Sequence, residues 1–361
     1  MAYTTIDDPT IYFNTILYTG DGSTSNAITG VGFQPDWVWI KRRNNGNPHF
    51  LNDIVRGATK DLRADNTDAE TTNNQYGILK SFDSDGFTVS VGSTNGARAN
   101  TSGGTFVAWN WKGGGSASSN SNGSITSSVS ANTTAGFSIV TWTGSGSDAT
   151  IGHGLSSAPE MYVVKNRDDS ADWRVGQTVA GNTMTGGNGY YMEWNATKAS
   201  TNPGSATTWG STPTAPTSSV FTVGSSNTHN GSSDNMLAYC FHSVKGYSRI
   251  SSYVGNGNSN GTFVYTGFKP AYLMVKRSSG TGNWTVYNNK SQTINEMDKQ
   301  IYYNLSNAEG TSGTKIFDFC ATGFKARGNA TDTNSSGSTY IYYAVAENPT
   351  VTSTGIAALA R

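Results

Sequence analysis

Three lysines occupy corresponding places in the sequence, and lysine can serve as a base or a nucleophile. They are Lys41, Lys165 and Lys276, each at the end of an apolar run. A reactive lysine needs a desolvated pocket and a partner group. A lysine that ends a buried strand more often lays its methylene stem on the core and keeps its ammonium in water. The pattern therefore favours a structural role over catalysis.

Acidic residues supply no recurrent pair for acid–base chemistry. Glycoside hydrolysis uses two carboxylates that face one bond, and no acidic position recurs in all three copies of the pattern described below. The pair Asp83 and Asp85 resembles the start of a calcium loop, but the further oxygen ligands and the bidentate Glu are not at the required spacing. A surface turn is the favoured interpretation, with a weak calcium site left open. We expect no catalytic residue, no metal and no cofactor.

Two tryptophans are the remaining residues that could bind a ligand. Trp173 and Trp284 stand 111 positions apart in the segments SADWRV and GNWTV, and His49 occupies the corresponding place earlier in the chain. Indole rings on a β-sandwich can stack on the apolar C–H faces of sugars, although tryptophan is more often part of a core. Both roles stay open, and the sugar-contact hypothesis names Trp173 and Trp284 as possible glycan-contact residues.

These residues belong to a pattern that occurs three times. An aromatic-x-Gly-x-Gly segment begins at Tyr18, Trp142 and Tyr253. A proline follows 17 residues later and a lysine six residues after it, at Pro35 and Lys41, Pro159 and Lys165, and Pro270 and Lys276. A later Asn precedes a second aromatic by nine residues, at Trp109, Tyr239 and Tyr343. Self-similarity at a fixed period indicates a repeated structural unit.

Each unit is predicted to consist of short β-strands. Segments such as Trp37 to Ile40 are apolar on both faces, which is typical of a central strand buried on both sides, and the proline is expected to begin that strand. The Gly-x-Gly segments predict tight turns with positive φ. No long stretch has helical periodicity, so the fold class is all-β, a tandem array of β-sandwich repeats of jelly-roll or lectin-like type.

The spacing also sets domain boundaries. We expect an N-terminal arm over 1–10, repeats over 11–112, 135–246 and 247–348, and a C-terminal tail over 349–361. The Gly- and Ser-rich residues 113–134 between the first two repeats, with Gly113 to Ser124 at their start, have the composition of a flexible linker. The arm is either an anchor to a partner or an ordered first strand.

Composition narrows the partners. Lys plus Arg and Asp plus Glu both equal 24, so the formal net charge is zero, whereas nucleic-acid binding normally requires a basic face. No apolar run reaches the length of a membrane helix, and the first residues do not read as a signal peptide. We expect no nucleic acid, no membrane insertion and no general export.

With these motifs, the sequence resembles a family of tailed-phage proteins that is frequent in phages of marine bacteria. The resemblance is carried by Gly32-Phe33-Gln-Pro35 to Arg43, Gly267-Phe268-Lys-Pro270 to Arg277 and the closing aromatic strands. The second unit departs from it, with His153-Gly-Leu-Ser-Ser-Ala-Pro159. The resemblance implies a non-enzymatic virion protein, either a tail fibre or a capsid decoration, assembled in the host cytoplasm.

Partners and alternatives follow from that resemblance. Other virion proteins are the expected partners, and host surface polysaccharide is a possible one. Fibre and decoration proteins usually form symmetric oligomers, so we expect a homo-oligomer, with a trimer favoured. One alternative is a carbohydrate-binding adhesive surface protein, and a second is a polysaccharide depolymerase or glycosidase whose carboxylate pair would lie in one groove.

Overall fold

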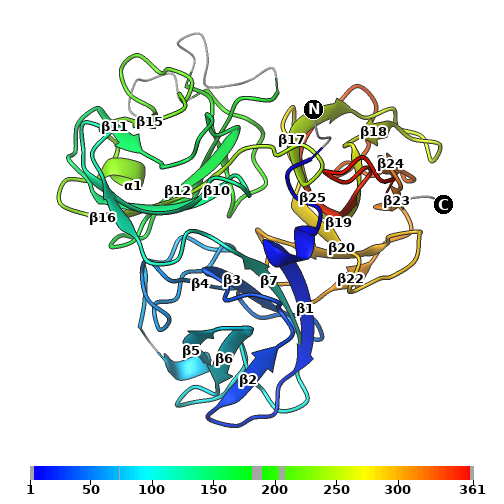
Figure 1. Ribbon diagram of the computed structural model, residues 1–361, viewed down its shortest axis with the longest axis horizontal. Coiled ribbons are helices and arrows are strands. Elements are labelled where there is room, and N and C mark those ends of the chain that lie inside the picture. Colours follow the sequence, from blue (N-terminus) through cyan, green and yellow to red (C-terminus); the bar gives the residue numbers. More distant parts are fainter. Residues whose placement is uncertain (1–3, 73, 181–188, 203–207, 358–361) are drawn as a thin grey trace.

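The computed structural model describes residues 4–72, 74–180, 189–202 and 208–357, and the described chain is almost entirely β-structure. The expected all-β sandwich fold is confirmed. Figure 1 shows three lobes grouped around a common centre, with the N-terminal part of the chain close to the C-terminal lobe. We call the three lobes units 1, 2 and 3, in the order in which the chain forms them.

Unit 1 consists of a four-stranded and a three-stranded antiparallel sheet. The larger has the order β1-β7-β3-β4 and the smaller the order β2-β6-β5. The elements are η1 (Pro9–Ile11), β1 (Phe13–Thr19), β2 (Asn26–Thr29), β3 (Trp37–Arg42), β4 (Phe50–Asp53), η2 (Asn74–Tyr76), β5 (Ile78–Asp83), β6 (Gly86–Ser90) and β7 (Thr105–Trp111).

Unit 2 follows the same plan, with extra strands at both ends of the large sheet and, among the described residues, one strand fewer in the small sheet. The large sheet has the order β14-β13-β12-β16-β10-β9-β8, and the small sheet pairs β11 with β15. The elements are β8 (Ser118–Asn120), β9 (Ser127–Asn132), β10 (Phe137–Thr143), β11 (Ala149–Gly152), β12 (Met161–Asn166), β13 (Arg174–Gln177), β14 (Met192–Glu193), β15 (Val220–Val223), α1 (Asn227–Asn230) and β16 (Asn235–Phe241).

Unit 3 has a six-stranded sheet of order β17-β25-β19-β20-β21-β22 and a small sheet of order β18-β24-β23. The elements are β17 (Ser248–Val254), β18 (Phe263–Tyr265), β19 (Phe268–Arg277), β20 (Trp284–Asn288), β21 (Lys299–Tyr302), β22 (Gly310–Thr311), β23 (Phe317–Cys320), β24 (Gly323–Ala326) and β25 (Thr339–Pro349). Four strands therefore recur in the same order in each large sheet. Superposition of whole units, with the predicted boundaries, stays a prediction.

The repeated central strand explains how these sheets pack. Alternate residues of a strand face opposite sides. In β3, Val38 and Ile40 pack against the small sheet of unit 1, whereas Trp37 and Trp39 face the centre of the molecule. The predicted burial of this strand on both faces is confirmed, and Lys41 continues the inward series.

The inward faces of the three large sheets share one core. Aromatic rings from different units contact each other in it: Trp37 stacks on Tyr239 with ring centroids 4.2 Å apart, and Trp39 stacks on Tyr303 at 3.8 Å. Phe241 and Tyr343 close the third side at 5.2 Å. The units are therefore not independent domains. One face of each large sheet is buried by the other two units and not by its own small sheet.

The linker prediction was wrong. Residues from Gly113 onward lie against unit 2, and β8 pairs with β9, which pairs with β10. A Cβ on Gly114 would lie 2.5 Å from the carbonyl oxygen of Ala131. Glycine is thus required here because two backbone segments approach closely. A segment of this kind is as rich in glycine as a flexible linker, so composition does not distinguish the two.

Two further expectations concern the N-terminal arm, for which two alternatives were open, and the repeat prolines, of which one needs correction. The described part of the N-terminal arm packs on the chain itself, since Ile6 lies in the common core and the carboxylate of Asp7 accepts a hydrogen bond from the Ser353 amide at 2.6 Å. Pro35 and Pro159 precede their strands by two residues, but Pro270 lies inside β19, at a break in the register with β25. A bulge accommodates a proline without loss of a ladder bond.

Candidate functional site

The three recurrent lysines end inward-facing strand positions and are fully buried. Each ammonium donates to a backbone carbonyl of another unit: Lys41 Nζ to Ser306 O at 3.1 Å, Lys165 Nζ to Thr67 O at 3.1 Å and Lys276 Nζ to Thr197 O at 3.2 Å. Each also donates to its own unit, as Lys276 does to Arg277 O at 2.7 Å. The structural role inferred from the sequence fits these contacts, but the expectation of a solvated ammonium was wrong.

Burial changes the ionisation of these lysines. Desolvation lowers the pKa of Lys41 and Lys165 to about 8 and that of Lys276 to about 7, only partly opposed by nearby carboxylates such as Asp332 beside Lys276. Lowered lysine pKa values also occur at catalytic sites. Here each nitrogen is directed at main-chain carbonyls between units, so the contacts are those of a structural crosslink.

Trp173 and Trp284 take part in the same interfaces and have no exposed surface. Trp173 Nε1 donates to Arg63 O of unit 1 at 2.8 Å, and Trp284 Nε1 donates to Glu193 O of unit 2 at 2.8 Å. A sugar ring could not stack on either indole without separating two units. The sugar-contact hypothesis for these two residues is therefore contradicted by their burial.

His49 completes the set in unit 1. Its Nδ1 accepts from Trp39 Nε1 at 2.8 Å, so the proton lies on Nε2, which donates to Tyr302 O of unit 3 at 2.9 Å. Burial, assisted by the charge of Lys41, lowers the pKa of His49 to about 3 and keeps the ring neutral. Each unit thus presents one lysine and one aromatic N–H donor to its neighbour.

The acceptors lie on three short segments, residues 63–70, 193–200 and 302–309, which we call the acceptor segments. Lys165 and Trp173 of unit 2 bond to the segment of unit 1, Lys276 and Trp284 of unit 3 to that of unit 2, and Lys41 and His49 of unit 1 to that of unit 3. The interfaces run head to tail and close into a ring, a heterologous arrangement of the kind that forms closed rings.

Sequence reasoning missed these segments. Aligned, they read RADNTDAE, EWNATKAS and YYNLSNAE, with Asp or Asn third, Thr or Ser fifth and Ala seventh. The third side chain fixes the start of the donor strand in its own unit: Asp65 accepts from His49 N at 3.0 Å, Asn195 from Trp173 N at 2.9 Å and Asn304 from Trp284 N at 3.0 Å.

Two of the three interfaces carry an additional ion pair. Arg43 pairs with Glu309 at 2.8 Å and Arg167 with Glu70 at 2.8 Å. Burial alone would raise the pKa of Glu70, but hydrogen bonds and charge from Arg167 and Arg56 lower it to about 2. The third interface has serine at both places, and its Ser200 N donates to Ser278 O at 2.8 Å, a main-chain bond that the other two interfaces also have.

The remaining recurrent aromatics belong to the common core. Trp109, Tyr239 and Tyr343 lie at corresponding positions in β7, β16 and β25 and are all buried. The hydroxyl of Tyr239 donates to Asp53 of unit 1 at 2.8 Å, and that of Tyr343 accepts from Trp111 Nε1 of unit 1 at 3.4 Å. Their roles are in packing and in joining units.

Metal-site geometry is missing where the sequence raised the question. Asp83 accepts from the Thr88 hydroxyl at 2.7 Å, and Asp85 from the amides of Gly30 and Gly32, at 3.0 and 2.7 Å. Both carboxylates therefore hold a turn. Across the described residues, no group of three or more His, Cys, Asp or Glu side chains is placed to hold a metal ion. No described helix is long and apolar enough to cross a membrane.

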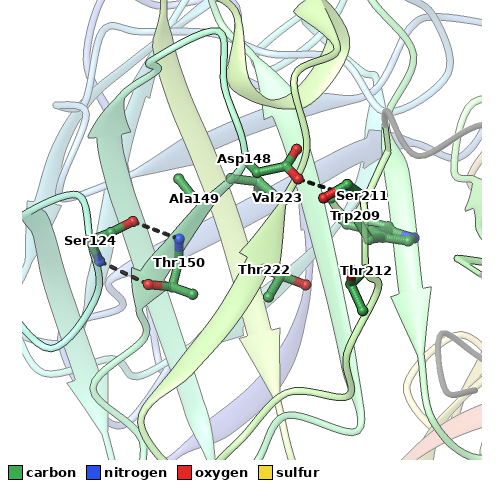
Figure 2. Close-up of a pocket in the computed structure, with 10 residues that line it drawn as sticks. Ser124, Asp148, Ala149, Thr150, Trp209, Ser211, Thr212, Thr222 and Val223 are labelled. Atoms are coloured by element: carbon green, nitrogen blue, oxygen red, sulfur yellow. Dashed lines mark hydrogen bonds between the residues drawn. The ribbon is translucent and has the colours of Figure 1, made fainter. Parts of the chain in front are cut away.

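A pocket in unit 2 is a candidate binding site. It has a volume of about 280 Å³ and lies over the small sheet, beside the loop that contains Trp209. Its lining carries the hydroxyls of Ser124, Thr150, Ser211, Thr212 and Thr222 and the carboxylate of Asp148. Figure 2 shows Thr150 and Thr222 on neighbouring strands, with Ser211 and Thr212 on the loop beyond them.

Hydrogen bonds hold most of this lining in place. Ser124 and Thr150 exchange two bonds, at 2.8 and 2.9 Å, and Asp148 accepts from Ser211 N at 2.6 Å. Trp209, which belongs to the loop beside the pocket, is buried and its Nε1 donates to Tyr190 O at 3.1 Å. The Thr222 hydroxyl is buried beside the pocket and has no hydrogen-bond partner among the described residues.

The pocket lies on a small sheet for which the described residues of unit 2 supply no third strand. Units 1 and 3 place β5 and β23 beside β6 and β24, whereas the described small sheet of unit 2 has two strands only. The segment that precedes β15 contains Pro213 and Pro216, and proline cannot donate to a sheet ladder. Hydroxyls with one carboxylate can exchange hydrogen bonds with a neutral polyol. The lining has one carboxylate, whereas glycoside hydrolysis uses two.

Two comparisons with known proteins bear on the chain. A family model described as "Domain of unknown function (DUF7483)" matches residues 8–349, which include all three units and their ring of interfaces. A search of curated proteins returned no match.

Proposed function

We propose that this chain, which belongs to the DUF7483 family of unknown function, is a non-enzymatic structural protein of a bacteriophage virion. It would serve as a tail fibre component or a capsid decoration, with other virion proteins as its partners. Its ring body would present loops and pockets on the outside, where neighbours and host surfaces are met.

The observation that carries the proposal is the use made of the recurrent polar residues. Lys41, Lys165 and Lys276 each bond across an interface. The residues that the repeat requires are thus those that join the units, and this is what a structural body needs. Specific function would then depend on features of one unit, such as the unit 2 pocket.

Imaging of purified particles tests the proposal directly. Gold-labelled antibody against the chain should decorate intact virions at one repeated position, on the tail or on the capsid. Label that stays in the soluble lysate and never sediments with particles would contradict a virion role.

The unit 2 pocket favours a second, compatible function, contact with a neutral sugar of host surface polysaccharide. A carboxylate and several hydroxyls at one place match the hydrogen-bonding needs of a polyol. Removing a hydrogen bond from a charged group costs about 1.5–3 kcal/mol, so Asp148→Asn should weaken polysaccharide binding at least tenfold, measured by titration calorimetry. The matched control is Asp318→Asn, a carboxylate on the small sheet of unit 3. Equal binding by both variants and the parent protein would rule out the pocket.

A further inference from the structure

The first strand of each large sheet has an outer edge, and two of the three edges are covered by the chain itself. In unit 2, β9 pairs along β10, with Ser130 opposite Ile139 and Asn132 opposite Phe137. In unit 3, the segment that crosses from unit 2 covers β17. Val244 and Ser248 exchange main-chain bonds at 3.1 and 2.8 Å, and Ile250 N donates to the Ser243 hydroxyl at 2.9 Å.

The corresponding strand of unit 1 is β1, the outermost strand of its sheet. Tyr12 O accepts from Lys112 N and Gly20 N donates to Gly104 O, just beyond the two ends of β7, so the even-numbered residues of β1 are those that face β7. The backbone N–H and C=O groups of Phe13 and Thr15 therefore point away from the sheet, since successive residues alternate in direction. Thr15 opposes Trp109 as Ile139 opposes Tyr239 and Ile250 opposes Tyr343, so these three positions correspond.

A cleft of about 230 Å³ lies along this edge, between unit 1 and unit 3. One wall is Thr10 and Phe13 to Thr15, and the other contains Ala271, Asn289, Lys290 and residues 346–348. The cleft occurs at the interface that the chain does not cross, because the N-terminal strand of the ring meets the C-terminal strand there.

Side chains around the cleft differ from those at the two crossed interfaces. The residue after the repeat proline is Asp36 in unit 1 and Glu160 in unit 2, and each carboxylate holds a crossing segment, at Gly115 N (3.1 Å) and Ser243 N (2.6 Å). The third position is Ala271. This unit therefore has no carboxylate where a crossing segment of the same chain would be held.

Thr15 also departs from its counterparts. Ile139 and Ile250 lie in the common core, whereas the Thr15 side chain has a hydroxyl, is 3% exposed and has no hydrogen-bond partner in the described part of the chain. The side-chain oxygen of Asn289, on the opposite wall, is likewise buried and unpaired among the described residues. Buried polar groups are normally paired, so these atoms indicate a polar occupant.

We propose that this cleft accepts an extended segment of a partner protein, which adds to β1 as a further strand. Strand addition obtains affinity from main-chain hydrogen bonds and specificity from pockets for alternate side chains. The chain contains its own example, since β9 (SSVSAN) covers the corresponding edge of unit 2. The fitting segment is therefore rich in small and β-branched residues, with a polar side chain directed at Thr15 and Asn289. The inference does not depend on the virion proposal.

A labelled peptide of residues 126–133 (TSSVSANT) serves as the probe, and its binding is measured by fluorescence anisotropy. Thr15→Pro removes the outward N–H while an edge strand tolerates proline. The loss of one main-chain bond should weaken binding about tenfold. Thr15→Ile copies the residue of the other units, keeps the amide and should bind within a few-fold of the parent. Leu17→Pro removes the next outward N–H, which the register of β9 on β10 would place opposite Ser128 of the probe, and should weaken binding by a similar factor.

Hydrogen exchange of the unmodified protein keeps the test independent of how well the proline variants fold. With peptide bound, the amides of Phe13 and Thr15 should exchange more slowly than without it. Three results would each overturn the proposal: no binding at millimolar peptide, equal binding by Thr15→Pro and the parent, or protection elsewhere but not in β1.

Discussion

Lys276 offers the sharpest test of the ring of interfaces. It is fully buried and donates to Thr197 O of unit 2 at 3.2 Å and to Arg277 O at 2.7 Å. Lys276→Met keeps the length and apolar stem of the side chain but removes the ammonium. The variant therefore separates the cost of burying a titratable group from the packing of its stem.

The magnitude follows from the pKa of Lys276, which desolvation lowers from 10.5 to about 7 in the folded state. Between these values the folded chain has released a proton that the unfolded chain still holds, so stability rises with pH. The slope is about 1.4 kcal/mol per pH unit for one group. The unfavourable contribution is complete below pH 7 and disappears above 10.5. From pH 7 to pH 9, the parent should gain about 2 kcal/mol relative to Lys276→Met, because the folded-state group is already half deprotonated at pH 7.

Urea unfolding at pH 7, 8 and 9 measures this difference, and only the change with pH is interpreted. The matched control is Lys80→Met, an exposed lysine that donates one bond to Thr24 O. Its difference from the parent should stay constant with pH. Parallel pH profiles for the parent and Lys276→Met would show that the ammonium is solvated and that the described interface is incorrect.

Three further changes probe the turns and interfaces. Asn334→Ala removes a buried side-chain amide that donates to Asn258 O and Gly328 O, at 2.9 and 2.8 Å. It should lower the free energy of unfolding, measured in urea, by about 2–4 kcal/mol. A loss under about 1 kcal/mol would mean that the turn does not depend on this amide. Ser200→Glu with Ser278→Arg copies the ion pair of the other two interfaces and should add up to about 1 kcal/mol of coupling in a double-mutant cycle, whereas zero coupling would argue against equivalent interfaces. The lowered pKa of Glu70, about 2, contributes stability above pH 4.5 that is lost as pH falls to 2; Glu70→Gln should remove about 3 kcal/mol of that acid dependence in urea unfolding, and an unchanged acid profile would contradict it.

The sequence predicted the repeated strands because their signals are local. The run from Trp37 to Ile40 is apolar at every position, and only a strand covered on both faces requires that. Gly22 in the first turn has a φ of +76°, which its place in Gly-x-Gly predicts. A one-unit pattern cannot tell whether the second covering layer comes from the same unit or from a neighbour. The burial of Trp173 and Trp284 between units therefore could not be predicted from the pattern of a single unit.

The acceptor segments were missed for a different reason. Residues 63, 193 and 302 are 130 and 109 positions apart (193 − 63 and 302 − 193), whereas the lysines are 124 and 111 apart (165 − 41 and 276 − 165). Loops of unequal length shift the second half of each unit out of register with the first. What the segments supply across the interfaces is mainly carbonyl oxygen, which every residue type has. The side chains of these segments therefore give little indication in the sequence that their main chain forms an interface.

Head-to-tail interfaces explain why the chain carries three units. Each unit has two surfaces to pair: its hydrogen-bond donors (the lysine and the aromatic N–H) and its acceptor segment. When two units are joined in a row, the donors of one unit and the acceptor segment of the other stay unpaired. The third unit closes the ring when Lys41 reaches Ser306 and Arg43 reaches Glu309. That closing interface is also the one that the backbone does not cross. Its cohesion rests on non-covalent contacts between the ends of the chain, and the proposed acceptor edge of β1 lies beside them. A partner strand bound there would contact units 1 and 3 together, so attachment to a neighbour and closure of the ring would stabilise each other.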